Sequence, residues 1–247
     1  MNWELMGEAL PQLLGGVPDT LTLVATSLAL GVVLAVGLAQ MRLSKNRVLS
    51  PLAYGYVYIF RSTPLLVQIF LIYYGSGQFR PLLQDIGLWT LFREPYFCAI
   101  LALMLNTGAY TSEIIRGGIQ SVPFGEVEAG RAIGMSRFQL FRRVIFPQAI
   151  RQALPAYGNE VILMVKSSSL ASTITILEVT GIAKKIIAAT FQPVEVFIIA
   201  GSIYLLINFL VTRVIQFTER RLNPQYYRER SAKAVVKPDE SADALVH

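Results

Sequence analysis

Near the N-terminus, residues 20–41 read TLTLVATSLALGVVLAVGLAQM, a segment of 22 residues without a charged side chain. A helix needs about 20 mostly apolar residues to cross the hydrocarbon core of a bilayer, which is about 30 Å thick. At about 1.5 Å per residue, this segment would form a helix about 33 Å long. No Lys or Arg precedes it, and its apolar run exceeds the about 7–15 residues of a signal peptide. We therefore expect a helix that is retained in the membrane.

The composition of the whole chain also indicates a protein that lies in lipid. Of its 247 residues, 53% are hydrophobic and 15% are charged, against about 25% charged residues in a typical soluble domain. These values exclude a disordered chain and an ordinary soluble enzyme. The single cysteine, Cys98, and the single histidine, His247, exclude an internal disulfide, a zinc site and a histidine-based catalytic triad.

Four further apolar segments predict membrane spans, so the expected fold class is an all-α membrane protein with five transmembrane helices. The five spans are expected at about 20–41, 52–79, 96–112, 155–177 and 196–217. Together they would form one transmembrane domain, 1–222. The remaining residues, 223–247, are polar and contain two prolines, which predicts a loose tail.

The distribution of Lys and Arg predicts the orientation of the spans. The connections between spans 1 and 2 and between spans 3 and 4, together with the chain from residue 213 onward, carry 16 of the 22 basic residues, and the opposite side carries four. Cytoplasmic connections are enriched in Lys and Arg. We therefore expect a periplasmic N-terminus and a cytoplasmic C-terminus. This arrangement accounts for the net charge of +6, and no nucleic-acid partner is expected.

The longest connection, between spans 3 and 4, predicts two short helices joined at an angle. Acidic residues open the first helix near Glu126, and Gly134 ends it. Ser136 is a suitable N-cap for a second helix over 137–145, which we expect to stop before Pro147. Such an elbow, 123–147, either docks onto a partner through its apolar residues or lies flat on the lipid surface.

Part of this elbow resembles the EAA signature of ABC-importer permeases. That signature reads E-A-A, three residues, G, nine residues, then I-x-L-P. Here Glu128-Ala129-Gly130 is followed by Gly134 and then by Val144-Ile-Phe146-Pro147, with the same spacing. The chain departs from the signature at Gly130, Val144 and Phe146, and each replacement remains small or apolar.

Further motifs extend the resemblance to about residues 15–222. Arg61-Ser-Thr-Pro-Leu-Leu-Val-Gln68 is similar to the second-span motif of polar amino-acid permeases, and four more motifs follow in the family's order, at 106–119, 147–151, 155–161 and 166–170. Within the family the chain is most similar to the M-type subunit of basic amino-acid and opine importers of the octopine or nopaline type.

The resemblance implies a type I ABC-importer permease fold in the bacterial inner membrane and a set of partners. These are a second, Q-type permease chain, two ATP-binding subunits that hold ATP and Mg, and a periplasmic substrate-binding protein. The chain itself has no G-x-x-x-x-G-K-[ST] loop, so no ATP site or other cofactor is expected on it. The residues implied to couple it to the ATPase are Glu128, Ala129, Gly130, Gly134 and Pro147.

Charged side chains within the spans are the candidate substrate ligands, because ionisable groups at bilayer depth usually face a cavity or a partner. Glu160 suits a cationic substrate, or else pairs with Lys166 or Arg61. Lys166 suits a substrate carboxylate, and the serines after it suggest a break in span 4. Arg61 lines a pathway, braces Glu113 or Glu160, or snorkels to the interface. Gln68, Asn159 and Ser169 complete the candidate set.

The function expected from these features is that of a permease subunit in an ATP-driven importer of basic amino acids or opines. The alternative is a secondary amino-acid transporter driven by an ion gradient. Secondary transporters often contain inverted repeats, and the sequence shows no internal repeat. An intramembrane enzyme would need a nucleophile with a base or a set of metal ligands, which one cysteine and a terminal histidine do not supply.

Overall fold

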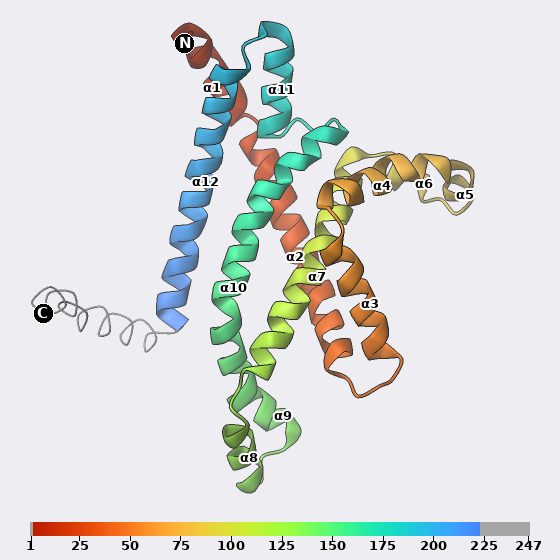
Figure 1. Cartoon of the computed structure of the whole chain (residues 1–247), viewed down its shortest axis with the longest axis vertical. Coiled ribbons are helices and arrows are strands. Elements are labelled where there is room, and N and C mark those ends of the chain that lie inside the picture. Colours follow the sequence, from red (N-terminus) through yellow and green to blue (C-terminus); the bar gives the residue numbers. More distant parts are fainter. Residues whose placement is uncertain (1, 223–247) are drawn as a thin grey trace, which may run out of the picture.

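The computed structural model describes residues 2–222, which fold into helices with no strand between these limits (Figure 1). The predicted polar tail, 223–247, lies outside the described residues. In chain order the helices are α1 (Trp3–Leu14), α2 (Val17–Leu43), α3 (Leu49–Ser62), α4 (Leu65–Gln78), α5 (Arg80–Asp85), α6 (Trp89–Phe92), α7 (Pro95–Gln120), α8 (Phe124–Ala132), α9 (Arg137–Leu140), α10 (Phe146–Ser167), α11 (Val179–Thr190) and α12 (Pro193–Leu222).

The prediction of an all-α membrane protein is confirmed. Within residues 2–222, three helical segments are long and apolar enough to cross a membrane, namely Trp3–Leu43, Pro95–Gln120 and Pro193–Leu222. Two bent helix pairs raise the number to five when each pair is counted as one span. The first segment starts earlier than predicted, because α1 precedes the expected span.

Helix α7 lies at the centre of the bundle and packs most extensively against α2 and α10. The contact with α2 is close because two glycines face it. A Cβ atom on Gly31 would collide with the Thr107 side chain, and one on Gly108 would lie 2.8 Å from Leu34 Cδ2. Small residues at helix contacts in membranes let the backbones approach and gain van der Waals packing. The glycines of α2 and α7 therefore fix the central pair of helices.

The second predicted span is not one straight helix. Helices α3 and α4 meet at an angle of 102°. Thr63 is extended, with ψ 143°, and Pro64 follows it. The residue before a proline is disfavoured in the α region, so the helix ends there. As a result α4, α5 and α6 project sideways from the bundle (Figure 1).

The predicted end of the elbow's second helix before Pro147 is wrong. Helix α9 continues through a π-helical turn, Phe141–Ile145, directly into α10. Pro147 lies in the first two positions of α10, directly after the π-helical turn, and contributes no N–H to the hydrogen bonds between the two. The elbow and the fourth span are therefore parts of one helical rod that starts at Arg137.

The predicted break at the serine triplet is present. Helix α10 ends at Ser167, and Ser168–Ile174 forms a 3₁₀ helix. Four hydroxyl groups in this segment donate to the carbonyl three residues earlier, at 2.6–2.8 Å, from Ser168, Ser169, Ser172 and Thr173. These bonds supply partners to carbonyls that the change of helix type would leave without a donor.

The elbow has the predicted turn and cap. Gly134 has φ +80°, a left-handed conformation that glycine adopts without strain. Ser136 caps α9 through a capping box with Gln139: the Gln139 N–H donates to Ser136 Oγ, and the Ser136 N–H donates to Gln139 Oε1. The elbow forms one end of the molecule, and α11 and the N-terminal helix lie at the other (Figure 1).

A buried carboxylate holds the start of α11. Glu178 is fully buried and accepts hydrogen bonds from the backbone N–H groups of Thr180 and Gly181, both at 2.9 Å. The Tyr204 hydroxyl on α12 donates to the same carboxylate at 2.6 Å. Glu178 therefore satisfies the free N–H groups at the N-terminus of α11 and ties α11 to α12.

Candidate functional site

A cleft of about 440 Å³ opens where the break between α3 and α4 faces α7 and α10. A cavity of this size lies within the range of small-molecule sites, about 300–1,000 Å³. Its polar lining comes from three separate parts of the chain, and its members are Arg61, Ser62, Thr63, Asn106, Tyr110, Glu160 and Ser167. Leu163 and Met164 add apolar surface from α10.

Glu160 supplies the carboxylate of this cleft. It lies on α10 and is 6% exposed. The Thr107 hydroxyl on α7 donates to Glu160 Oε1 at 2.9 Å. No ion pair involves Glu160 within residues 2–222, so neither Lys166 nor Arg61 neutralises it by direct contact. A buried carboxylate with one hydroxyl donor retains acceptor capacity for a cation.

Arg61 supplies the positive charge of the cleft. Its guanidinium group lies 5.1 Å from the centre of the Tyr110 ring, in a cation–π contact between α3 and α7. The Tyr110 hydroxyl donates to the Arg61 carbonyl at 3.4 Å. Arg61 itself is exposed. The cleft therefore carries a carboxylate and a guanidinium group on different helices.

An amide network holds the rim of the cleft. The Gln68 side-chain N–H₂ donates to the Phe60 and Thr63 carbonyls at 2.9 and 3.1 Å, and to Thr63 Oγ1 at 2.8 Å. Asn106 on α7 donates to Gln68 Oε1 at 3.0 Å. The ends of the broken helix thus find their partners in Gln68, which acts as a support for the break. Its amide groups are already occupied by protein partners.

The other predicted ligands lie outside this cleft. Asn159 is exposed and does not line it, although Glu160 beside it does. Lys166 is exposed at the end of α10, and the Ser169 hydroxyl donates to the Lys166 carbonyl at 2.7 Å. Neither of them lines the cleft. Tyr110 and Thr107, which complete the surroundings of Arg61 and Glu160, were not predicted, because tyrosine and threonine are common in apolar helices and carry no charge to single them out.

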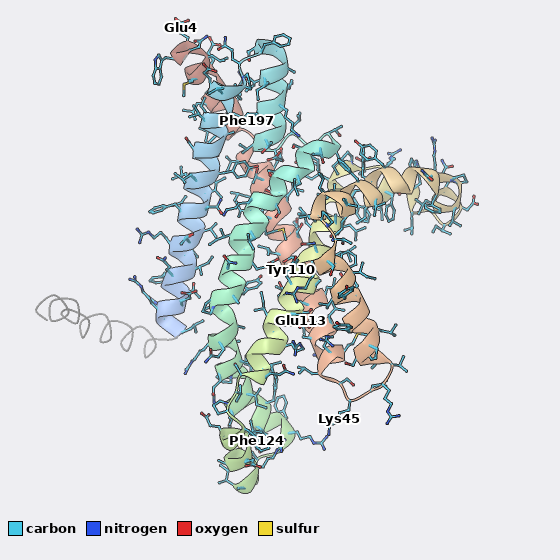
Figure 2. The ribbon with its side chains drawn as sticks, in the orientation of Figure 1. Glu4, Lys45, Tyr110, Glu113, Phe124 and Phe197 are labelled. Atoms are coloured by element: carbon cyan, nitrogen blue, oxygen red, sulfur yellow. The ribbon has the colours of Figure 1, made fainter. Side chains whose placement is uncertain are left out.

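A second cleft of about 350 Å³ adjoins the first and shares Arg61, Ser62 and Tyr110 with it. Glu113 lines this second cleft and bridges two cations: Arg42 on α2 at 3.1 Å and Arg116 on α7 at 2.7 Å. Figure 2 shows Tyr110 and, nearer the elbow, Glu113 along α7. The proposed brace between Arg61 and Glu113 is absent from the described residues, because Glu113 is held by Arg42 and Arg116 instead.

The elbow presents an apolar surface with charges of both signs, among which arginines are the more numerous. Phe124, Ile133 and Phe138 are exposed on the elbow, and Figure 2 labels Phe124 there. Glu128 and Ala129 are also exposed, and no side-chain partner of Glu128 occurs within the described residues. Three of the predicted coupling residues have structural roles within the elbow. Gly130 packs against α9, Gly134 forms the left-handed turn, and Pro147 lies at the start of α10.

A close contact between helices explains why position 130 is a glycine. A Cβ atom there would lie 2.6 Å from Leu140 Cδ1, so α8 and α9 touch at this position. Glu126 on α8 also accepts a hydrogen bond from the Gln148 side chain on α10. The elbow is therefore attached to the rod on which Glu160 lies.

Comparison with known proteins places this architecture in a family. Residues 27–224 match the family described as the binding-protein-dependent transport system inner membrane component. The chain is 67% identical over 224 residues to a nopaline transport system permease protein of Agrobacterium fabrum, covering 91% of this chain and 93% of that protein. It is 53% identical to an octopine transport system permease protein of Rhizobium meliloti, covering 95% and 94% of the two chains.

Two more distant comparisons agree with these. A histidine/lysine/arginine/ornithine transport system permease protein of Salmonella typhimurium is 45% identical over 83% of this chain and 88% of that protein. Among solved structures, an amino acid ABC transporter crystallised with histidines superposes with a TM-score of 0.79 at 34% identity, covering 90% of this chain and 99% of the other. The family match covers most of the chain, and so the chain belongs to the inner-membrane components of binding-protein-dependent transport systems, as a multi-pass permease.

Proposed function

We propose that this chain is a translocating subunit of an ATP-driven importer that carries arginine-type opines, nopaline first among them, and basic amino acids. The observation that carries the proposal is the pair of opposite charges in one cleft, Glu160 and Arg61. The names of its relatives at 67%, 53% and 45% identity point to the same substrate class.

The chemistry of the cleft suits such a substrate. A basic amino acid or an arginine-type opine has a cation at one end and carboxylate at the other. A carboxylate binds a guanidinium group through two parallel hydrogen bonds, and Arg binds a carboxylate in the same way. Glu160 would take the cationic end and Arg61 the anionic end. Each contact replaces water in a site that is partly buried, where charge-assisted hydrogen bonds are stronger.

The proposed assembly follows the resemblance to ABC importers. A second permease chain completes the pore, two ATP-binding subunits contact the elbow, and a periplasmic binding protein delivers the substrate. The elbow would dock through its exposed apolar residues and Glu128, with the C-terminus in the cytoplasm and the N-terminus in the periplasm. ATP with Mg acts on the ATPase partners, and the pore alternates between inward-facing and outward-facing states.

The test is uptake of labelled nopaline and labelled arginine by the whole complex in proteoliposomes, with ATP inside and the binding protein outside. Glu160→Gln is expected to reduce uptake by about ten- to a hundred-fold, because a hydrogen bond to a charged group contributes about 1.5–3 kcal/mol. Asn159→Ala is the matched control, because Asn159 is the neighbouring residue on α10 and lies outside the cleft.

Equal uptake by Glu160→Gln and the parent complex would remove Glu160 from the substrate site. Uptake that continues without ATP but stops when the proton gradient is collapsed would instead support the secondary transporter. Uptake of neither substrate by the parent complex, with active binding protein and ATPase, would refute the proposed substrate class.

A further inference from the structure

An apolar groove of about 630 Å³ lies at the elbow end of the bundle, away from the residues that form the polar cleft. The C-terminal half of α2, the end of α7 and the start of α10 line it. Gln40 and Ser44 are its only polar lining residues among the described part of the chain. At Val32 and Ile150 the groove continues into a second cavity of about 300 Å³ that reaches Tyr157 on α10.

The length of this groove matches one leaflet of a membrane. Along α10 it extends from Phe146 to Tyr157, a separation of eleven residues. At about 1.5 Å per residue this is about 16 Å. Half of a hydrocarbon core about 30 Å thick is about 15 Å. An acyl chain that enters at the elbow end would therefore be covered along its whole length.

At the elbow end, four cations lie within three residues of groove-lining residues in the sequence. Lys45 and Arg47 follow Ser44, which lines the groove, and Arg142 and Arg143 follow Phe141, which lines it from the opposite side. All four are exposed, and none has a carboxylate partner within residues 2–222. Figure 2 places Lys45 at the same end of the bundle as Phe124 of the elbow.

We propose that this groove binds an anionic phospholipid from the leaflet on the elbow side. One acyl chain lies between α2 and α10, and the phosphate lies among Lys45, Arg47, Arg142 and Arg143. Basic pockets between transmembrane helices at the cytoplasmic side bind anionic head groups, whereas a zwitterionic head group gains little from the added cations. The proposal rests on the membrane location of the chain and is independent of the substrate proposed above.

The experiment uses the whole importer complex in lipid nanodiscs that contain phosphatidylglycerol with a photoreactive group on one acyl chain. After illumination, labelled peptides are mapped by mass spectrometry. Label is expected on the α2 and α10 peptides that line the groove. Phosphatidylcholine with the same photoreactive chain is expected to label them much less.

Two variants test the two halves of the site. Val36→Trp fills the groove, because Val36 lines it and is 41% exposed, and it should remove most of the label. Val33→Trp is the matched control, because Val33 lies on the same helix, is 73% exposed and is outside the groove. Lys45→Gln with Arg142→Gln should lower labelling by phosphatidylglycerol by about five-fold for each cation removed.

Equal labelling of the Val36→Trp and Val33→Trp complexes would overturn the proposal. So would equal labelling by the two phospholipids, because it would show that the groove does not select an anion. A third contrary result is cross-linking of Cys introduced at Val36 to the second permease chain without any lipid label, which would assign the groove to a helix of that chain. Because Lys45 and Arg142 are exposed, their substitution tests the head-group site even if tryptophan at Val36 disturbs folding.

Discussion

Tyr204→Phe removes one hydroxyl group from the start of α11 and leaves the ring in place. That hydroxyl donates to the fully buried carboxylate of Glu178 at 2.6 Å, and the same carboxylate accepts the N–H groups of Thr180 and Gly181. A hydrogen bond to a charged group contributes about 1.5–3 kcal/mol. The N-terminus of α11 should therefore open about ten- to a hundred-fold more often in the variant.

Hydrogen–deuterium exchange of the whole complex in nanodiscs measures this opening directly. Peptides that cover Thr180 and Gly181 should exchange about ten- to a hundred-fold faster in Tyr204→Phe, because local opening sets the exchange of protected amides. Tyr74→Phe is the control, since the Tyr74 hydroxyl is on an exposed residue and reaches only the Thr173 carbonyl, at 3.4 Å. Unchanged exchange of α11 in Tyr204→Phe would show that Glu178 holds α11 without help from α12.

Two further predictions concern glycines. Gly118→Ala should lower the melting temperature of the complex, because the added Cβ would lie 2.7 Å from the Ala149 carbonyl oxygen. Overpacking of this kind costs about 1–3 kcal/mol. Gly117→Ala should leave the melting temperature unchanged, because a Cβ there has no neighbour within 4 Å. Gly134→Val should abolish the stimulation of ATPase activity by loaded binding protein, because valine does not readily adopt the φ of +80° found there. Gly134→Asn should retain part of this stimulation, because asparagine tolerates a left-handed conformation.

Each of these predictions has a contrary result. If Gly117→Ala and Gly118→Ala melt at the same temperature, α7 and α10 can separate at this point without loss of stability. If Gly134→Val keeps full stimulation while the complex assembles normally, the turn of the elbow is not needed for contact with the ATPase, and the role proposed for Gly134 is wrong.

The long apolar runs and the helix caps could be predicted from the sequence, because local physical rules fix them. An uncharged run such as 20–41 has few alternatives to a spanning helix. Ser136 has a glutamine three residues later, which makes a capping box. The hydroxyls after Lys166 supply partners at a helix break, and the break is found there.

The same local rules do not distinguish Pro64, where the helix breaks, from Pro147, where it continues. Both prolines interrupt an apolar segment, but one follows an extended residue and the other follows a π-helical turn. The difference depends on neighbours distant in the sequence. Near Pro64, the distant neighbour is Asn106 on α7, which donates to the Phe60 carbonyl at 3.3 Å and to Gln68 Oε1 at 3.0 Å.

Of the residues that line the candidate site, the sequence predicts only the two charged ones. Arg61 and Glu160 stand out because ionisable groups at bilayer depth are costly, and both line the cleft. Lys166 met the same criterion and lies outside the cleft, since the position of a side chain around α10 depends on which helices cover each face. Gln68 is among the predicted ligands, but its side-chain amide is bonded to the ends of the break beside it.

The rod that begins at Arg137 and carries Glu160 has a mechanical consequence. Glu160 lies fourteen residues after Phe146 along α10, a rise of about 21 Å. Pro155 lies between these two positions, and a proline inside a helix removes one backbone hydrogen bond and favours a bend. A displacement of the elbow therefore reaches the Glu160 carboxylate through a segment with a defined bending point, whereas Arg61 lies on a different helix. The two charges that face the cleft therefore lie on separate helices, and only Glu160 lies on the segment that continues into the elbow.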